Sequence, residues 1–244
     1  MTGSRPPKPK RRWYQFSLRS LLVFVLAAGL GLGLLGRRIR QVQEQRKPVI
    51  ELQKLGATVE YQETEGGLSN ALLRNLVGDE ALPVVEIYFL RTEVTDAGLV
   101  HLKGMRSLEV VDLRCTQVSD AGLVHLKGMR SLEVVDLRST QVSDAGLVHL
   151  KGLTSLEVLY VNNTKITDAG LEHLKGLSSL EGLSLLGTQV TDAGLEHLKG
   201  LSSLEWMNLC NTQVTEGGVQ ELQQALPNCV IGFWTTPDPW SFGD

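Results

Sequence analysis

Residues 97–120 read AGLVHLKGMRSLEVVDLRCTQVSD, and residues 121–144 read AGLVHLKGMRSLEVVDLRSTQVSD. The two stretches differ at one position only, where Cys115 stands against Ser139. The same spacing continues along the chain, because a histidine recurs every 24 residues from His101 to His197. A fixed period of this length is typical of a repeat architecture, in which one structural unit stacks on the next.

Each unit contains a short stretch in which apolar residues alternate with other residues. In one unit the apolar residues are Leu108, Val111, Leu113 and Val118, and equivalents recur over six units from residue 84 to residue 227. Alternation predicts a short strand with one buried face. Because no single strand can bury that face alone, we expect parallel strands about 4.8 Å apart over a continuous aliphatic core.

The other half of each unit, Ser or Thr followed by Asp-Ala-Gly-Leu, predicts a short helix that begins at the hydroxyl residue. The aspartate then lies in the first turn, where free N–H groups and the helix dipole favour a carboxylate. We therefore interpret the aspartates as helix-capping residues and not as calcium ligands, which would have to surround one ion. They are Asp96, Asp120, Asp144, Asp168 and Asp192.

The pattern LxxLxLxxTxV, followed by TDAGLxHLKGL, resembles the leucine-rich-repeat family, and the spacer resembles its bacterial, membrane-anchored members. The resemblance implies an α/β solenoid: a right-handed coil with short parallel strands on the concave face and short helices on the convex face. The family's usual asparagine is replaced by threonine, whose hydroxyl can still bond the turning backbone. The threonines are Thr92, Thr116, Thr140, Thr164, Thr188 and Thr212.

A solenoid needs covered ends, and the sequence on either side of residues 84–227 loses the period. We expect residues 37–83 to form a juxtamembrane segment and an N-terminal cap, and residues 228–244 a capping strand and a tail. The cap elements predicted are helices over Val49–Leu55 and Leu68–Leu76 with a strand over Thr58–Tyr61, then a helix over Val219–Leu226 and a strand over Val230–Phe233.

Residues 20–36 form an uncharged, largely apolar run between Arg19 and Arg37, preceded by the basic tail 1–19. As a helix it reaches about 26 Å, near the thickness of a bilayer core. We interpret it as a signal anchor with the N-terminus in the cytoplasm and the repeats outside, and the alternative is a cleaved signal peptide that leaves a secreted protein. Gly29 and Gly33 form a GxxxG pair, which indicates either weak self-association or simply the glycine content of membrane helices.

Charge separates the head of the chain from its body. Residues 1–47 carry a net +10, so residues 48–244 carry −13 of the total of −3. An acidic body repels phosphate, which argues against a nucleic-acid partner. Three cysteines are too few for a disulfide scaffold, although one disulfide with a free thiol fits the count.

The repeated histidines raise a metal hypothesis, but zinc needs ligands that converge on one point, whereas a straight row diverges. We interpret them as a solvated repeat position and predict no metal and no cofactor. The sequence also contains no phosphate loop, GxSxG, HExxH or CxxC motif. We therefore expect a protein that is not an enzyme.

The units differ most at the strand positions that face the concave side. Aromatic residues beside arginine are typical of protein interfaces. The sequence therefore predicts a membrane-anchored protein that binds an unidentified protein partner through this face, and the alternative is an envelope-associated structural spacer without a ligand. The predicted contact residues are Tyr88, Leu90, Asp112, Arg114, Asp136, Arg138, Tyr160, Asn162, Leu186, Trp206 and Asn208.

Overall fold

The computed structural model describes residues 46–61, 84–89 and 92–233, all of which belong to the unit Val42–Asp244. These residues form an eight-stranded sheet whose strands follow chain order. β1 is antiparallel to β2, and β2 to β8 are parallel. The strands are β1 (Thr58–Tyr61), β2 (Val84–Tyr88), β3 (Val110–Asp112), β4 (Val134–Asp136), β5 (Val158–Tyr160), β6 (Gly182–Ser184), β7 (Trp206–Asn208) and β8 (Val230–Gly232).

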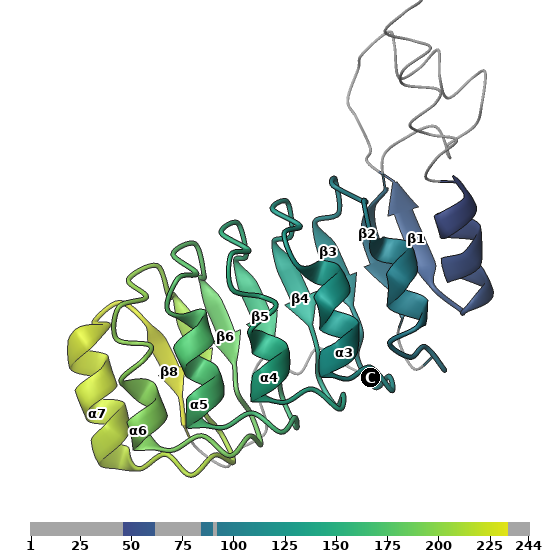
Figure 1. The fold of residues 1–244 in the computed structure, drawn as a ribbon. Coiled ribbons are helices and arrows are strands. Elements are labelled where there is room, and N and C mark those ends of the chain that lie inside the picture. Colours follow the sequence, from purple (N-terminus) through teal and green to yellow (C-terminus); the bar gives the residue numbers. More distant parts are fainter. Residues whose placement is uncertain (1–45, 62–83, 90–91, 234–244) are drawn as a thin grey trace, which may run out of the picture. The chain divides into compact units, whose positions relative to one another are not determined.

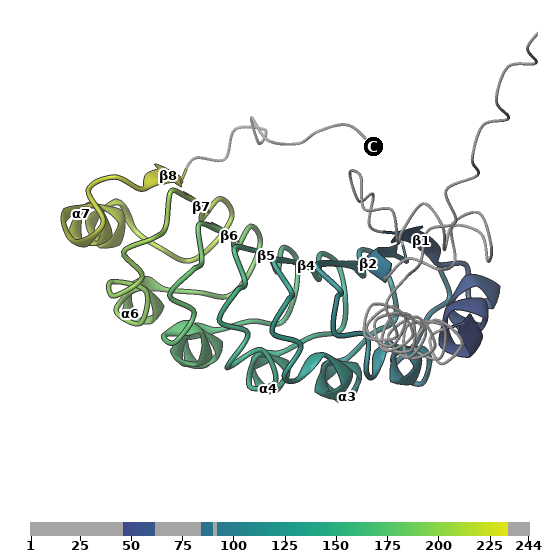
Figure 2. The same ribbon diagram turned by 90° about the horizontal axis from the view of Figure 1, so that it is seen from above.

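From β2 onwards, short helices return the chain from one strand to the next and lie on the outer side of the curve, opposite the strands (Figures 1 and 2). Strands pack more closely than helices, so a stack of such units bends towards its sheet. The solenoid expected from the repeat is therefore confirmed. The helices are residues 46–54, η2 (Gly98–Leu102), α3 (Asp120–Leu123), η3 (Val124–Leu126), α4 (Asp144–Leu147), α5 (Asp168–Leu171), η4 (Glu172–Leu174), α6 (Asp192–Leu195) and α7 (Glu216–Ala225).

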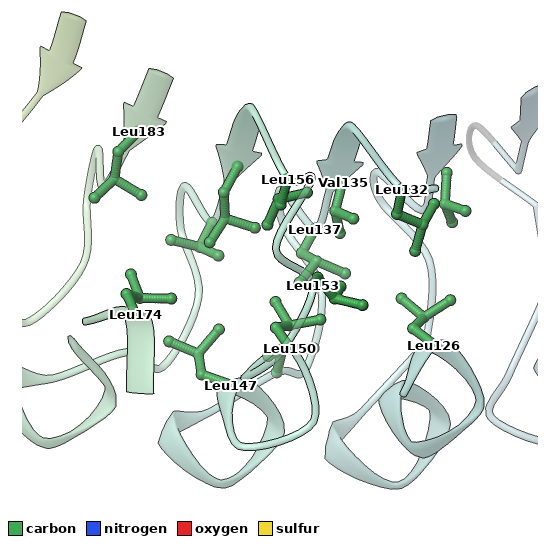
Figure 3. Close-up of a cluster of buried hydrophobic side chains, with 14 of the residues drawn as sticks. Leu126, Leu132, Val135, Leu137, Leu147, Leu150, Leu153, Leu156, Leu174 and Leu183 are labelled. Atoms are coloured by element: carbon green, nitrogen blue, oxygen red, sulfur yellow. The ribbon is translucent and has the colours of Figure 1, made fainter. Parts of the chain in front are cut away.

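The core is a ladder of aliphatic side chains between the sheet and the helices (Figure 3). Val111, Val135 and Leu159 occupy equivalent places in neighbouring strands, and each is fully buried. The helices contribute a second row, which includes Leu147 and Leu174. Each coil thus shelters its neighbour's leucines from water, which is why the period of the sequence alone predicts these residues correctly.

Five of the six predicted threonines, from Thr116 to Thr212, donate a side-chain hydrogen bond to the backbone just after β3 to β7. Thr140 Oγ1 donates to the carbonyl oxygen of Leu137 at 2.7 Å, and the threonines at 116, 164, 188 and 212 repeat this bond. The residue just before the threonine turns the chain through the left-handed region, with φ of 55° at Ser139 and 53° at Asn163. A hydroxyl thus replaces the family's amide in stabilising the turn.

The interpretation of the aspartates needs a correction. Four of the five aspartates are the first residue of their own helix, and Asp96 lies two residues before η2. Each carboxylate nevertheless bonds to the next repeat: Asp144 accepts from the backbone N–H and the hydroxyl of Thr167, at 2.8 and 2.6 Å. Thr167 caps α5 by accepting from the N–H of Ala169. The carboxylate therefore braces the first turn of the following helix, where the helix dipole favours it.

The glycine of Asp-Ala-Gly makes room for this contact. A Cβ built on Gly170 would lie 2.4 Å from Oδ1 of Asp144, closer than any real contact. The same overlap occurs at Gly122, Gly146, Gly194 and Gly218. The glycine and the aspartate 26 residues before it are thus two halves of one inter-repeat joint, which a single unit of sequence does not reveal.

The ends of the stack agree with the predicted caps where they are described. β1 matches the predicted strand, and the helix over residues 46–54 overlaps the predicted Val49–Leu55. α7 begins three residues before the predicted Val219 and ends one residue before Leu226, and β8 follows as the last strand. The predicted helix Leu68–Leu76 lies outside the described residues.

The predicted membrane segment, residues 20–36, also lies outside the described residues. Within residues 46–61, 84–89 and 92–233, no helix has the length and apolar character needed to span a bilayer. All three cysteines lie in the described residues, and no two of them form a disulfide, so the disulfide alternative is not found in this structure. Burial raises the pKa of Cys229 to about 11.

Candidate functional site: the concave row

Five side chains on the concave face of β2 to β7 form the candidate site, which we call the concave row. The row consists of Tyr88, Arg114, Arg138, Tyr160 and Trp206, all half-buried. Strand pairing places the residues of β3, β4 and β5 side by side, since Asp112 aligns with Asp136 and Asp136 with Tyr160. The row crosses the strands obliquely, because Arg138 lies two residues beyond the aligned position of Asp136 and Tyr160, whereas Trp206 lies opposite Gly182, two residues before that position.

The two arginines are held by the aspartates two residues before them. Arg138 Nε donates to both carboxylate oxygens of Asp136, at 3.1 and 3.0 Å, and Arg138 Nη2 lies 2.8 Å from Oδ2. Arg114 makes the same contacts with Asp112 and also lies 3.5 Å from Asp136. Such two-point pairs fix the plane of the guanidinium group.

The aspartates are nearly inaccessible to water, whereas the arginines are about one third exposed. Burial raises the pKa of the Asp136 carboxyl, and the hydrogen bonds from Arg138 oppose this rise without cancelling it. The buried carboxylates thus orient the guanidinium groups, and the guanidinium groups are the charged atoms that reach the surface.

Arg138 also begins an aromatic stack. Its guanidinium carbon lies 5.0 Å from the ring centroid of Tyr160, within the range of a cation–π contact. The Tyr160 and Trp206 rings follow, with centroids 5.7 Å apart and planes tilted by 37°. One cation and two aromatic rings therefore form a continuous surface from β4 to β7.

Gly182 in β6 explains how β5 and β7 make contact across the strand between them. A Cβ built on Gly182 would lie 2.2 Å from Cζ2 of Trp206, so the indole rests directly on this glycine. Strand pairing puts Gly182 between Val158 of β5 and Trp206 of β7. Sequence reasoning did not single out Gly182. A glycine aligned with a tryptophan one period later is the signal that would have found it.

At the other end of the row, the Tyr88 hydroxyl donates a short hydrogen bond to the carboxylate of Glu86. This bond, together with partial burial, raises the pKa of Tyr88 above the ordinary tyrosine value. The hydrogen bond to Glu86 thus fixes the direction of the Tyr88 hydroxyl.

Asn162 supplies a further polar group. It is 5% exposed, and its Oδ1 has no hydrogen-bond partner among the described residues. Buried carbonyl oxygens are usually paired, and an unpaired one costs about 1–3 kcal/mol. Asn162 follows Tyr160 by two residues, so this acceptor belongs to the same strand end as the aromatic stack.

The predicted contact residues thus divide into two groups. The members of the concave row and Leu186 are half-buried, while Asp112, Asp136, Asn162 and Asn208 are buried, with 4 to 6% exposure. Leu90 lies outside the described residues. Asn208 accepts a hydrogen bond from its own strand end, the N–H of Cys210, at 3.0 Å. In this structure the buried aspartates position their neighbours.

The five repeated histidines are half-buried and lie on the helices or in the turns that follow them, one in each unit except the last. Within residues 46–61, 84–89 and 92–233, no three His, Cys, Asp or Glu side chains are grouped so that they could hold a metal ion. The two sides of the solenoid therefore differ in chemistry. The strand side carries the stacked arginine, tyrosine and tryptophan of the concave row, and the helix side carries histidines that are separated from one another.

A repeat of short parallel strands and outer helices, with a variable concave surface, defines a solenoid of the kind that the sequence motif implies. Two models of leucine-rich repeats match the sequence, one of a single repeat over residues 104–126 and one of two copies over residues 130–176. The chain is a leucine-rich-repeat protein.

Solved structures of similar fold include two internalins of Listeria monocytogenes. InlF is 17% identical, with a TM-score of 0.47, over 68% of this chain and 54% of that one, so this chain spans about half its length. InlC2 is 23% identical, with a TM-score of 0.45, over 63% of this chain and 81% of that one. A leucine-rich-repeat protein of Leptospira interrogans is 18% identical, with a TM-score of 0.42, over 59% of this chain and 41% of that one. No curated protein sequence matches significantly.

Proposed function

We propose that this protein binds a protein partner on the concave row, is held at a membrane by residues 20–36, and has no catalytic activity of its own. The observation that carries the proposal is the contact series Arg138, Tyr160 and Trp206. Tyrosine, tryptophan and arginine dominate the binding energy of protein interfaces. The leucine-rich-repeat fold itself favours protein–protein interaction.

The row is also ordered before a partner arrives. The arginines are clamped by aspartates, the tyrosine by a cation and an indole, and the indole rests on Gly182. Side chains that are already fixed lose less entropy on binding.

The binding proposal is tested by proximity labelling from the full chain in its own cells, compared with the variant Tyr160→Ala, Trp206→Ala. Each truncation removes a partly exposed aromatic side chain and leaves the core intact, so we expect folding to persist. Loss of two central aromatic residues reduces binding by roughly two orders of magnitude, so the partner's label should disappear. The control Val148→Ala removes an exposed apolar side chain from the outer face and should leave the label unchanged.

An unchanged set of labelled proteins, with the variant folded by circular dichroism, would contradict the concave row and favour the structural spacer. The membrane part is tested separately by alkaline extraction and by mass spectrometry of the mature N-terminus. We expect a chain that resists extraction and still contains Trp13. A mature chain that begins after residue 36 would show that the segment is a cleaved signal peptide.

A further inference from the structure

A second surface of the first two repeats has a different character from the concave row. The loops that lead from η2 to β3 and from η3 to β4 enclose a hollow of about 380 Å³. Its lining contains Lys103, Arg106, Lys127 and Arg130, together with His125, and no acidic residue. These are four of the thirteen basic residues of the acidic segment 48–244.

No ion pair with any described residue neutralises these four cations. By contrast, Lys199, at the same position of a later repeat, bonds to Glu196 three residues before it and lies 3.7 Å from Glu221. In the first two repeats the place of Glu196 is taken by Val100 and Val124. The hollow therefore keeps its full positive charge, which like-charge repulsion disfavours unless an anion is present.

The arginines of the hollow are particular to these two repeats. The equivalents of Arg106 and Arg130 in the next three units are Thr154, Ser178 and Ser202, although the rest of the motif is retained. The repeat therefore folds equally well without arginine here. Two adjacent guanidinium groups offer paired N–H donors that match the oxygen atoms of a phosphate group.

Exposed valines accompany the cations. Val100 and Val124 are 45% and 44% exposed, and each precedes a lysine of the hollow by three residues. Cationic side chains beside exposed aliphatic ones suit the boundary of a bilayer, where charge meets headgroups and apolar groups meet acyl chains. A nucleic acid would gain nothing from the valines and would meet the acidic remainder of the body.

We propose that this hollow binds the phosphate of an anionic lipid headgroup, so that the first two repeats lie against a membrane surface. Arg106 and Arg130 hold the phosphate oxygens, Lys103 and Lys127 add charge, and the valines contact the lipid beside it. The inference does not rest on the concave row, because it uses other residues on other elements. The two proposals therefore fail independently.

The test is hydrogen exchange of the full chain mixed with vesicles of phosphatidylcholine, with or without phosphatidylglycerol. We expect slower exchange of the backbone amides in residues 103–131 only when phosphatidylglycerol is present. The basic residues 1–47 also attract anionic vesicles, so the local readout is compared between variants. In Arg106→Ser, Arg130→Ser, which copies later repeats, the concentration of phosphatidylglycerol vesicles needed for half of the protection should rise about thirty-fold, because each basic residue near a surface contributes about 1 kcal/mol.

The matched control is Lys151→Ser, Lys175→Ser, which removes two positive charges, as the arginine variant does, but from repeats that lack the arginines. Vesicles that contain phosphatidylglycerol should protect residues 103–131 of this control as they protect the unchanged chain. Three results would overturn the proposal. They are equal protection with phosphatidylcholine alone, equal protection by inorganic phosphate without vesicles, and undiminished protection in the double arginine variant.

Discussion

The outer and inner faces of the solenoid repeat at the same spacing but obey different constraints. On the outer face every aspartate from Asp96 to Asp192 accepts two hydrogen bonds from the next repeat, at 2.6 to 2.8 Å. On the inner face β4, β5 and β6 present Asp136, Tyr160 and Ser184 at one aligned position. The comparison teaches that a residue repeats where a hydrogen bond to the next coil requires that residue type, and differs where no such bond does.

The largest expected effect on the free energy of unfolding comes from adding a methyl group to a glycine of the outer face. In Gly170→Ala the new Cβ would lie 2.4 Å from Oδ1 of Asp144, so the carboxylate must leave Thr167. Overpacking and the loss of hydrogen bonds to a charged group lower the free energy of unfolding by about 3 kcal/mol. Denaturant unfolding of the full chain in detergent measures it.

The control for this substitution is Gly176→Ala, because a Cβ on Gly176 meets no atom within 4 Å and its φ is not positive. Its free energy of unfolding should stay within about 0.5 kcal/mol of the unchanged chain. Equal stability of the two variants would show that the aspartate and glycine joint does not hold the repeats together.

The same substitution on the inner face should have a smaller effect on stability and a clear effect on the site. In Gly182→Ala the Cβ would overlap the indole of Trp206, which is half-exposed and can rotate away. We expect a loss of less than about 1 kcal/mol, since surface changes outside the core are mild. The emission of Trp206 should shift, measured in a chain whose other three tryptophans are phenylalanine.

Gly200→Ala is the control for Gly182→Ala, since a Cβ on Gly200, like one on Gly176, meets no atom within 4 Å. Its emission spectrum should equal that of the parent chain. If Gly182→Ala also left the emission unchanged, the indole would not rest on this glycine, and the stack with Tyr160 would need another explanation.

The smallest expected effect is the pH dependence that Asp136 contributes. Its pKa is raised in the folded chain by burial, so between the ordinary value of about 4 and the raised value the folded chain binds more protons than the unfolded chain. The free energy of unfolding relative to Asp136→Asn should therefore fall as pH rises through this window, then stay level. Denaturant unfolding of both chains at a series of pH values measures the difference. A difference that grows with pH would mean that Arg138 lowers the pKa of Asp136 instead.

The sequence by itself determined the repeat, the buried positions such as Val111 and Val135, the strand β1 and the bonding role of the threonines. These features are local or strictly periodic: apolar residues at a fixed spacing must stack, and a hydroxyl beside a turn finds the nearest carbonyl group. The position of the concave face also followed, because alternation in a strand separates inward from outward side chains.

Only the tertiary structure decided which residues of different coils make contact. The bond from Thr167 to Asp144 spans 23 residues, and the contact of Trp206 with Gly182 spans 24. A period shows that two coils are neighbours, but it does not show the direction of a side chain, which depends on the space that the neighbouring coil leaves. For this reason the sequence predicts that each aspartate caps its own helix, whereas the structure bonds it to the next repeat, and only the structure shows that the indole of Trp206 rests on Gly182.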